Sequence, residues 1–366
     1  MTTLTRWVTL CAAGALALAG SSAPAQAIPV FAHRYGFTCQ TCHTLVPHLN
    51  SFGARFLENG YRIAGLAPHG ALPLAVKIQL AYGSDVDPSH LPKALVDELE
   101  LLTGGAVGTR MSYFAETYLI DGGRPGAVRD AWAAYHVGAV EHPFSSATLT
   151  AGQFTLPLPI DPETFRETQT HYAIWDQVVG SNPFNFFSPH QGAALEFGSG
   201  GATTLAVAAL AGHDPRSGIA AYGIDRMEVI RHEGRAISLS AYRYDGARHV
   251  TATIDRFWRQ GYGLGAHAGP VEFDAVYQHG FDSDATGGSV AIRSSGGFAQ
   301  LRYALGSHDF ALVRYDGTQD VGGPYRALVF GAGHRFHHNT RLTFEDVMTH
   351  TPQTRNTFAA ALLFAY

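Results

Sequence analysis

The chain has 366 residues and a formal net charge of −5, which gives no reason to expect nucleic acid as a partner. Charged residues make up only 15% of it, against about 25% in ordinary soluble domains. It also carries 41 glycines, 16 tyrosines and 22 phenylalanines, a composition typical of an all-β membrane barrel and not of one small soluble module.

Residues 1–27 predict a secretory signal peptide. Arg6 supplies the positive start, and residues 7–20 form an apolar stretch shorter than the ~20 residues that span a bilayer. Residues 25–27 read Ala-Gln-Ala, which is an A-x-A cleavage site. Cys11 lies inside the apolar stretch, so the exported chain is expected to keep two of its three cysteines.

Those two cysteines belong to a C-x-x-C-H sequence, the attachment signature of a c-type haem. Cys39 and Cys42 lie three residues apart, so on one helical turn each thiol could form a thioether with a haem vinyl group. His43 would then ligate the iron as the proximal ligand. We therefore predict one covalent haem c. Two alternatives are a dithiol redox pair and a zinc site, which would need a fourth ligand such as His48.

Residues 28–70 predict a small α-helical cytochrome module. Thr38 suits the N-cap of a short haem helix, and Pro47 suits the first turn of a second helix. Gly53 lies on the apolar face of that second helix, where its missing side chain would let a flat ring approach. Asn59-Gly60 provides a left-handed helix end. The apolar face itself is formed by Leu49, Phe52, Phe56 and Leu57.

The distal ligand of the iron stays open at this point. Residues 28–110 contain no methionine, so the local candidates are His33, His48 and His69, and a five-coordinate iron is a further alternative. Ligation by a methionine gives the haem a higher reduction potential than ligation by two histidines. Such a methionine would have to come from the barrel wall. The wall candidates are Met111, Met227 and Met348.

Residues 71–366 predict a transmembrane β-barrel, because apolar and polar residues alternate with a period of two. Outer-membrane strands need only ~9–11 residues, and about 18 residues per strand and turn predict roughly 16 antiparallel strands, with 14 or 18 as alternatives. A soluble β-sandwich or propeller is the competing fold. The first run alternates over residues 74–82, and the last places Phe358, Ala360, Leu362, Phe364 and Tyr366 on one face. Further runs cover 108–120, 128–138, 147–155, 202–212, 235–245, 270–280, 296–305, 308–316, 325–336 and 340–349. Turn residues follow many of them, at 121–123, 245–246, 316–317 and 321–323.

Two other features of the barrel sequence have alternative interpretations. Residues 156–190 do not alternate and are rich in aromatics, so they predict either a loop folded into the lumen or an exposed extracellular loop. His334, His337 and His338 lie near a turn. They could bind a divalent metal transiently, or they could be ordinary polar residues of the lumen and loops.

The N-terminal motifs resemble those of the outer-membrane monohaem cytochrome–porin fusions of iron-oxidising bacteria. The resemblance rests on the C-x-x-C-H sequence and three flanking segments: Phe31-Ala32-His33-Arg34-Tyr35-Gly36, Pro47-His48-Leu49-Asn50-Ser51-Phe52-Gly53 and Asn59-Gly60-Tyr61. His33 occupies the usual arginine position of that family, and Arg34 follows it. The resemblance implies a 16-stranded barrel plugged by the cytochrome, with electrons passing inward from extracellular Fe(II).

Three functions follow as hypotheses. The first is an outer-membrane electron conduit with Fe(II) oxidase (cytochrome c) activity, from extracellular Fe(II) through one haem to a periplasmic cytochrome c acceptor. The second is a diffusion porin with the haem module as a redox plug. The third is a soluble periplasmic haem protein on a β scaffold. The first two place the protein in the lipid of a Gram-negative outer membrane.

Overall fold

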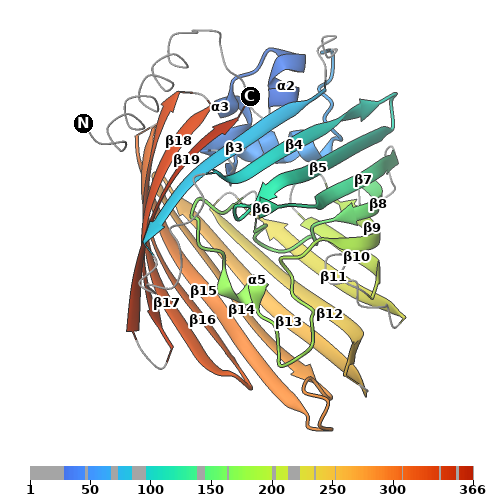
Figure 1. The fold of residues 1–366 in the computed structure, drawn as a ribbon. Coiled ribbons are helices and arrows are strands. Elements are labelled where there is room, and N and C mark those ends of the chain that lie inside the picture. The colour runs from blue at the N-terminus through green and yellow to red at the C-terminus, as the bar shows by residue number, and fades with distance from the viewer. Residues whose placement is uncertain are drawn as a thin grey trace, which may run out of the picture.

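The computed structural model is a closed antiparallel β-barrel with a small helical module at one end (Figure 1). The predicted signal peptide and the terminal Tyr366 lie outside the described part of the chain. The structure describes residues 29–45, 48–66, 73–84, 96–137, 145–162, 165–199, 203–212, 223–234, 236–251, 253–306, 308–337, 339–351 and 354–365.

Sixteen strands form the barrel wall, as the sequence predicts. Strand β6 only extends the pairing at the tip of β5, because β5 pairs directly with β7. The sheet closes where the last strand pairs with the first, for example Leu362 with Leu80. The strands are β3 (Ala75–Ser84), β4 (Val96–Val107), β5 (Met111–Asp121), β6 (Arg124–Pro125), β7 (Val128–Val137), β8 (Ser146–Phe154), β9 (His190–Gly198), β10 (Thr203–Ala211), β11 (Ile224–Glu233), β12 (Ile237–Val250), β13 (Thr253–Ala268), β14 (Val271–Asp282), β15 (Ile292–Leu305), β16 (Asp309–Asp320), β17 (Gly323–His337), β18 (Thr340–His350) and β19 (Thr354–Ala365).

The two faces of the wall differ in polarity. In β3, Gln79 faces the lumen and is buried, whereas Tyr82 faces outward and is 58% exposed. Closed barrels leave no unpaired strand edge, and an apolar outward face is what a bilayer requires. Aromatic residues recur on this outward face: Tyr82, Tyr135, Tyr262, Tyr277, Tyr303, Tyr315, Phe330, Phe344 and Phe358. Among the described residues, no helix is long and apolar enough to cross a membrane.

The two ends of the barrel also differ. At the short-turn end, where β3 starts and β19 finishes, the longest connection is 138–145. At the opposite, long-connection end, the four longest links are 155–189, 212–223, 85–95 and 283–291. Outer-membrane barrels have short turns on the periplasmic side and longer loops outside. By this rule the short-turn end faces the periplasm.

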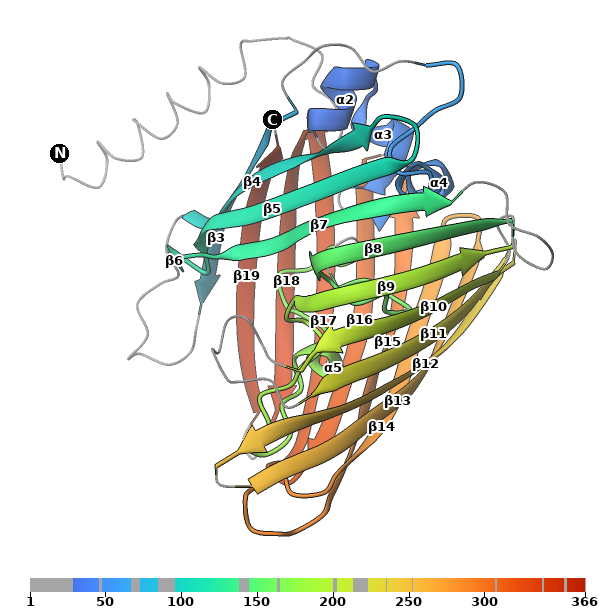
Figure 2. The ribbon, with the colours of Figure 1, turned by 90° about the vertical axis from the view of Figure 1, so that its right-hand side faces the viewer.

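The N-terminal module lies in the mouth of the short-turn end (Figures 1 and 2). It packs on the inner wall of β3, β4, β5 and β7. Its elements are α2 (Pro29–Tyr35), α3 (Cys39–Cys42), β1 (His43–Leu45), β2 (His48–Leu49) and α4 (Ser51–Glu58).

The connection between β8 and β9 is described at residues 155–162 and 165–189. This segment folds into the barrel and carries the short helix α5 (Ala173–Asp176) (Figure 2). We call it the lumenal loop. Of the two interpretations of this segment, the loop inside the lumen is confirmed and the exposed extracellular loop is wrong. Its apolar side chains find partners on the inner wall, which an exposed loop would lack.

Some sequence expectations about the strands are wrong. The alternation misses β4, β9, β11 and β13. Asp245-Gly246 and Asp316-Gly317 are not turns but lie within β12 and β16. Both aspartates have arginine partners within their own strand, at 2.7 Å from Arg243 and 2.6 Å from Arg314, so their charge does not require a turn.

Candidate functional site: the Cys39–Cys42–His43 turn

The two cysteines lie on the single turn of α3, with His43 directly after it. Cys39, Cys42 and His43 are each buried, at 2%, 5% and 6% exposed. The thiols are not joined in a disulfide. The backbone amide of His43 donates to the carbonyl of Cys39 and closes the turn, and β1 then pairs with β2 through His43 and Leu49.

Asn50 holds this turn against the next helix. Its side-chain oxygen accepts from the amides of Phe52 and Gly53, both at 2.9 Å, and so caps α4. Its side-chain nitrogen donates to the carbonyls of Gln40 and Thr41 at 3.1 and 3.2 Å. The side chain of Asn50 therefore links α3 to α4.

The local helix signals in the sequence are partly wrong. The second helix begins at Ser51 and not near Pro47, because Asn50 supplies the cap. Thr38 occupies the N-cap position of α3, but its side chain makes no capping hydrogen bond. The helix end at Gly60 is confirmed, with φ of +61° and its amide bonded to the carbonyl of Leu57.

Gly53 has a different role from the one predicted. It does not leave room for a flat ring, because the carbonyl of Cys42 fills the space where its side chain would be. A Cβ atom on Gly53 would lie 2.1 Å from that oxygen. The glycine therefore allows α3 and α4 to touch through their backbones.

Aromatic rings surround the turn. Phe56 is buried and makes edge-to-face contacts with Phe31 and Tyr35, with ring centroids 5.3 and 5.5 Å apart. Phe31 also stacks on Tyr61 at 4.3 Å. Of the predicted apolar face of α4, Leu57 is 41% exposed and does not join this core. The module thus forms an apolar cluster that includes Cys42.

Contacts with the wall fix the module in the barrel mouth. The ring of Phe31 lies over Gly104 of β4, and the guanidinium of Arg34 lies over Gly105, where side chains would collide with them. Arg62 donates to the backbone carbonyls of Gly108 and Met111 at the β4–β5 turn. The module is therefore docked by both apolar and polar contacts.

Burial sets the protonation of the two thiols. It raises the pKa of Cys39 to about 12, although nearby Arg335 acts in the opposite direction, and it raises the pKa of Cys42 to about 11. Both groups are therefore neutral thiols at physiological pH. A free thiol of this kind is a weak nucleophile and a weak metal ligand.

The donor set fits a covalent haem. Attachment needs two reduced thiols on one turn, which Cys39 and Cys42 supply, and an imidazole next to them, which His43 supplies. The surrounding rings offer the apolar environment that such a group requires. Among the described residues, no three His, Cys, Asp or Glu side chains come together in the manner of a simple metal site.

The structure narrows the candidates for a distal ligand. The side chains of His33 and His48, and all of His69, lie outside what the structure describes. The methionine alternative is wrong. Met111 and Met348 are exposed on the outward face, and Met227 is buried in the cluster around the lumenal loop. The wall therefore offers no methionine to this module.

Within the predicted histidine group near the β17–β18 turn, the structure describes the side chain of His334 alone. His334 pairs with Asp309 across β16 and β17 at 2.6 Å. The side chain of His337, and all of His338, lie outside the described residues. The His334–Asp309 pair is the partner arrangement expected of an ordinary polar histidine.

Sequence reasoning missed two sets of residues that shape the site. One is the glycine pair Gly104 and Gly105, which makes space on the wall for the module. The other is Trp132 of β7, whose ring stacks near Tyr61 at 6.4 Å and also packs against the cluster around the lumenal loop. Neither has a local sequence signal, because both act only through contacts distant in the chain.

Comparison with solved structures supports the barrel. The anion-selective porin of Comamonas acidovorans matches with a TM-score of 0.64 at 9% identity, over 80% of this chain and 98% of that one. OmpF of Salmonella typhi, in complex with daunomycin, matches with 0.61 at 12%, over 80% and 97%. The outer membrane channel DcaP of Acinetobacter baumannii matches with 0.57 at 12%, over 80% and 95%. No protein-family profile and no curated protein sequence matches the chain.

The chain therefore has the fold of the outer-membrane porins. A closed barrel with an apolar outward face belongs in the outer membrane of a Gram-negative cell. The third hypothesis, a soluble haem protein on a β scaffold, is wrong for this reason. Nothing in these comparisons bears on the N-terminal module.

Proposed function

We propose that the protein is an outer-membrane electron conduit of the monohaem cytochrome–porin type. The observation that carries the proposal is the turn itself: two buried, reduced thiols and an adjacent imidazole, held in the mouth of a porin-type barrel. When bound, a c-type haem supplies a one-electron carrier at this turn. Cys39 and Cys42 would hold it covalently, and His43 would ligate its iron.

The position of the module in the barrel indicates on which side of the membrane a redox partner would meet it. It lies at the short-turn end, which by the loop-length rule faces the periplasm. In this proposal the acceptor would be a periplasmic cytochrome c, and the donor, extracellular Fe(II), would approach from the long-connection end. Between the ends, Trp132 contacts the aromatic clusters of both the module and the lumenal loop.

The test uses the mature protein purified from outer membranes in detergent. A Soret band, with haem staining that survives denaturing electrophoresis, is expected for the wild type and not for Cys39→Ala/Cys42→Ala. Stopped-flow mixing with Fe(II) under anaerobic conditions is expected to reduce the haem. Absence of the Soret band would refute the haem, and a haem that Fe(II) never reduces would refute the iron donor.

A diffusion porin is the second candidate, and the fold comparisons favour it. All three structures named above match the barrel fold over 80% of this chain. The Comamonas protein is described as a porin, and the Acinetobacter protein is described as a channel. In this case the module would be a plug and solute passage the main activity. Swelling of liposomes in small sugars would support this function.

A further inference from the structure

We infer that the lumenal loop closes the barrel to hydrated solutes by itself, independently of the N-terminal module. This goes beyond the proposed function and does not depend on haem. Porin lumens are polar and water-filled. Here, by contrast, the middle of the lumen contains a dry core built from the loop and the inner wall.

Most of the apolar side chains of the loop are buried. Trp175 of α5 is 0% exposed and contacts Phe186 and Tyr242, with ring centroids 5.7 and 5.9 Å apart. The other buried loop residues are Leu156, Leu158, Ile160, Tyr172, Ile174 and Phe184. Their wall partners come from six consecutive strands, β10 to β15: Ala206, Ala208, Leu210, Met227, Val229, Tyr242, Tyr244, Phe257, Val276 and Phe298. Contacts of this kind leave no space for a water column on that side.

Polar contacts bind the loop to the neighbouring part of the wall, at β16 and β18. The carboxylate of Glu345, in β18, accepts from the amide and hydroxyl of Thr170 at 2.9 and 2.8 Å and from the amide of Gln169. Arg314, in β16, donates to the hydroxyl of Thr168 and the carbonyl of Thr170, both at 2.8 Å. Buried charged groups with this many partners are costly to separate.

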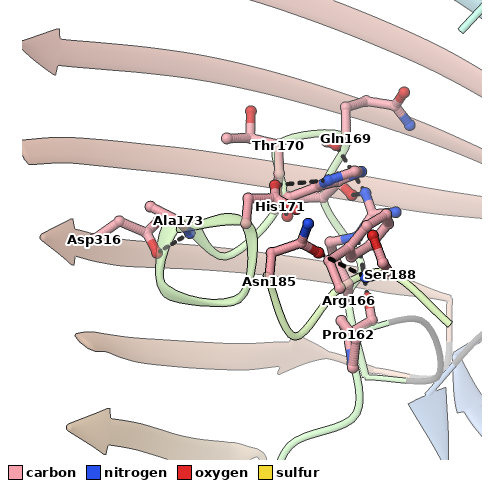
Figure 3. A network of polar contacts seen from close by, with 12 residues as sticks. Pro162, Arg166, Gln169, Thr170, His171, Ala173, Asn185, Ser188 and Asp316 are labelled. Atoms are coloured by element: carbon pink, nitrogen blue, oxygen red, sulfur yellow. Dashed lines mark hydrogen bonds and ion pairs between the residues drawn. The ribbon is translucent and has the colours of Figure 1, made fainter. Parts of the chain in front are cut away.

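Figure 3 shows hydrogen bonds between residues of the loop itself. Arg166 donates to the carbonyls of Pro162, Thr168 and Gln169 at 3.2, 2.6 and 2.7 Å. The side chain of Asn185 accepts from the amide of Ser188 at 2.8 Å. These bonds satisfy four backbone groups of the loop.

Further polar contacts join the loop to strands β15, β13 and β3. Glu167 pairs with Arg302 of β15 at 2.6 Å, and Asn182 donates to Asp255 of β13 at 2.8 Å. Gln169 exchanges hydrogen bonds with Gln79 of β3. The described contacts thus reach β3, the strands from β10 to β16, and β18.

Two lumen-facing residues of other strands are buried as well. Glu100 of β4 and Ala361 of β19 face the lumen and are 0% and 2% exposed. A cavity of about 500 Å³ does open beside the loop, between α5 and the ends of β16 and β17. Loop residues Thr170, His171 and Gln177 form one side of it, so it is a vestibule that stops at the loop.

The experiment is single-channel recording of the full-length protein in planar bilayers, with two matched pairs of substitutions. Arg314→Ala/Glu345→Ala releases the loop, and Phe31→Ala/Arg62→Ala releases the module. We expect no conductance steps from the wild type or from the module variant, and stepwise conductance from the loop variant. Arg243→Ala/Asp245→Ala, which removes an outward-facing pair, is the charge-matched control and should stay closed.

Replacement of residues 165–185 by a short Gly-Ser linker provides a second route to opening, with folding checked by heat-modifiable migration on gels. Porin-like steps from the wild type, or steps from the module variant alone, would overturn the inference. A folded linker variant that stays closed even when combined with Phe31→Ala/Arg62→Ala would overturn it too. A missing Soret band would refute the proposed haem and leave these recordings interpretable.

Discussion

Gly53 and Cys42 touch without an intervening side chain: a Cβ atom on Gly53 would lie 2.1 Å from the carbonyl oxygen of Cys42. Because that oxygen belongs to the backbone of the site, Gly53→Ala is expected to destabilise the module by about 1–3 kcal/mol. Thermal unfolding followed by near-ultraviolet circular dichroism measures this. Gly288→Ala is the control, since its nearest neighbouring atom would lie 3.5 Å away. Equal melting temperatures for the two variants would contradict the contact.

Asn50 offers a test that separates capping from the link between helices. Asn50→Ala removes both and is expected to cost about 1–2 kcal/mol for the cap alone. Asn50→Asp keeps an acceptor for the amides of Phe52 and Gly53 but loses the donor to the Gln40 and Thr41 carbonyls. Stability should fall in the order wild type, Asn50→Asp, Asn50→Ala. If the melting temperature of Asn50→Ala equals that of the wild type, the link contributes nothing to stability.

His43→Ala should separate attachment of haem from ligation of its iron. The thiols of Cys39 and Cys42 remain, so covalent haem is expected to survive denaturing electrophoresis. The Soret maximum should shift because the proximal ligand is lost, and added imidazole should restore it. His334→Ala, which removes a histidine paired with Asp309, is the control. An unchanged spectrum in His43→Ala would show that another residue ligates the iron.

The raised pKa values predict slow alkylation of the thiols in protein prepared without haem. Only the thiolate reacts, and a rise from 9.0 to about 11 leaves Cys42 with about 100-fold less thiolate at pH 8. The rate should therefore rise about tenfold for each pH unit up to that pKa. Mass spectrometry after timed iodoacetamide treatment gives the rate, and protein unfolded in urea is the reference. Equal rates in the folded and unfolded protein would contradict the burial.

Much of the barrel can be predicted from the sequence because most strands alternate in polarity. The alternation does not predict β11 and β13, both of which pack on the lumenal loop. In β11 the inward residues Met227 and Val229 are apolar because they pack on the loop, whereas Arg226 and Glu228 face outward as an ion pair. The usual polarity is inverted there.

In β13 the inward positions include Gly261 and Gly263, where Tyr242 and Pro159 take up the space. Glycines at this spacing favour a turn interpretation in the sequence, although they allow close packing in the barrel. The C-x-x-C-H motif is visible from sequence alone because it is local. The link from Asn50 to Gln40 and Thr41 is not, and neither are the contacts of Gly104 and Trp132, since these partners are chosen by the fold.

The apolar cluster of the module is completed by wall residues, among them Ala75, Leu102 and Phe114. The apolar cluster that includes Cys42 is therefore complete only after the cylinder has formed around it. For a chain that receives a prosthetic group in the periplasm, this fixes an order of maturation. If the proposed haem is bound, its attachment would have to precede barrel assembly, and the insertion machinery would receive a polypeptide whose cofactor is already in place.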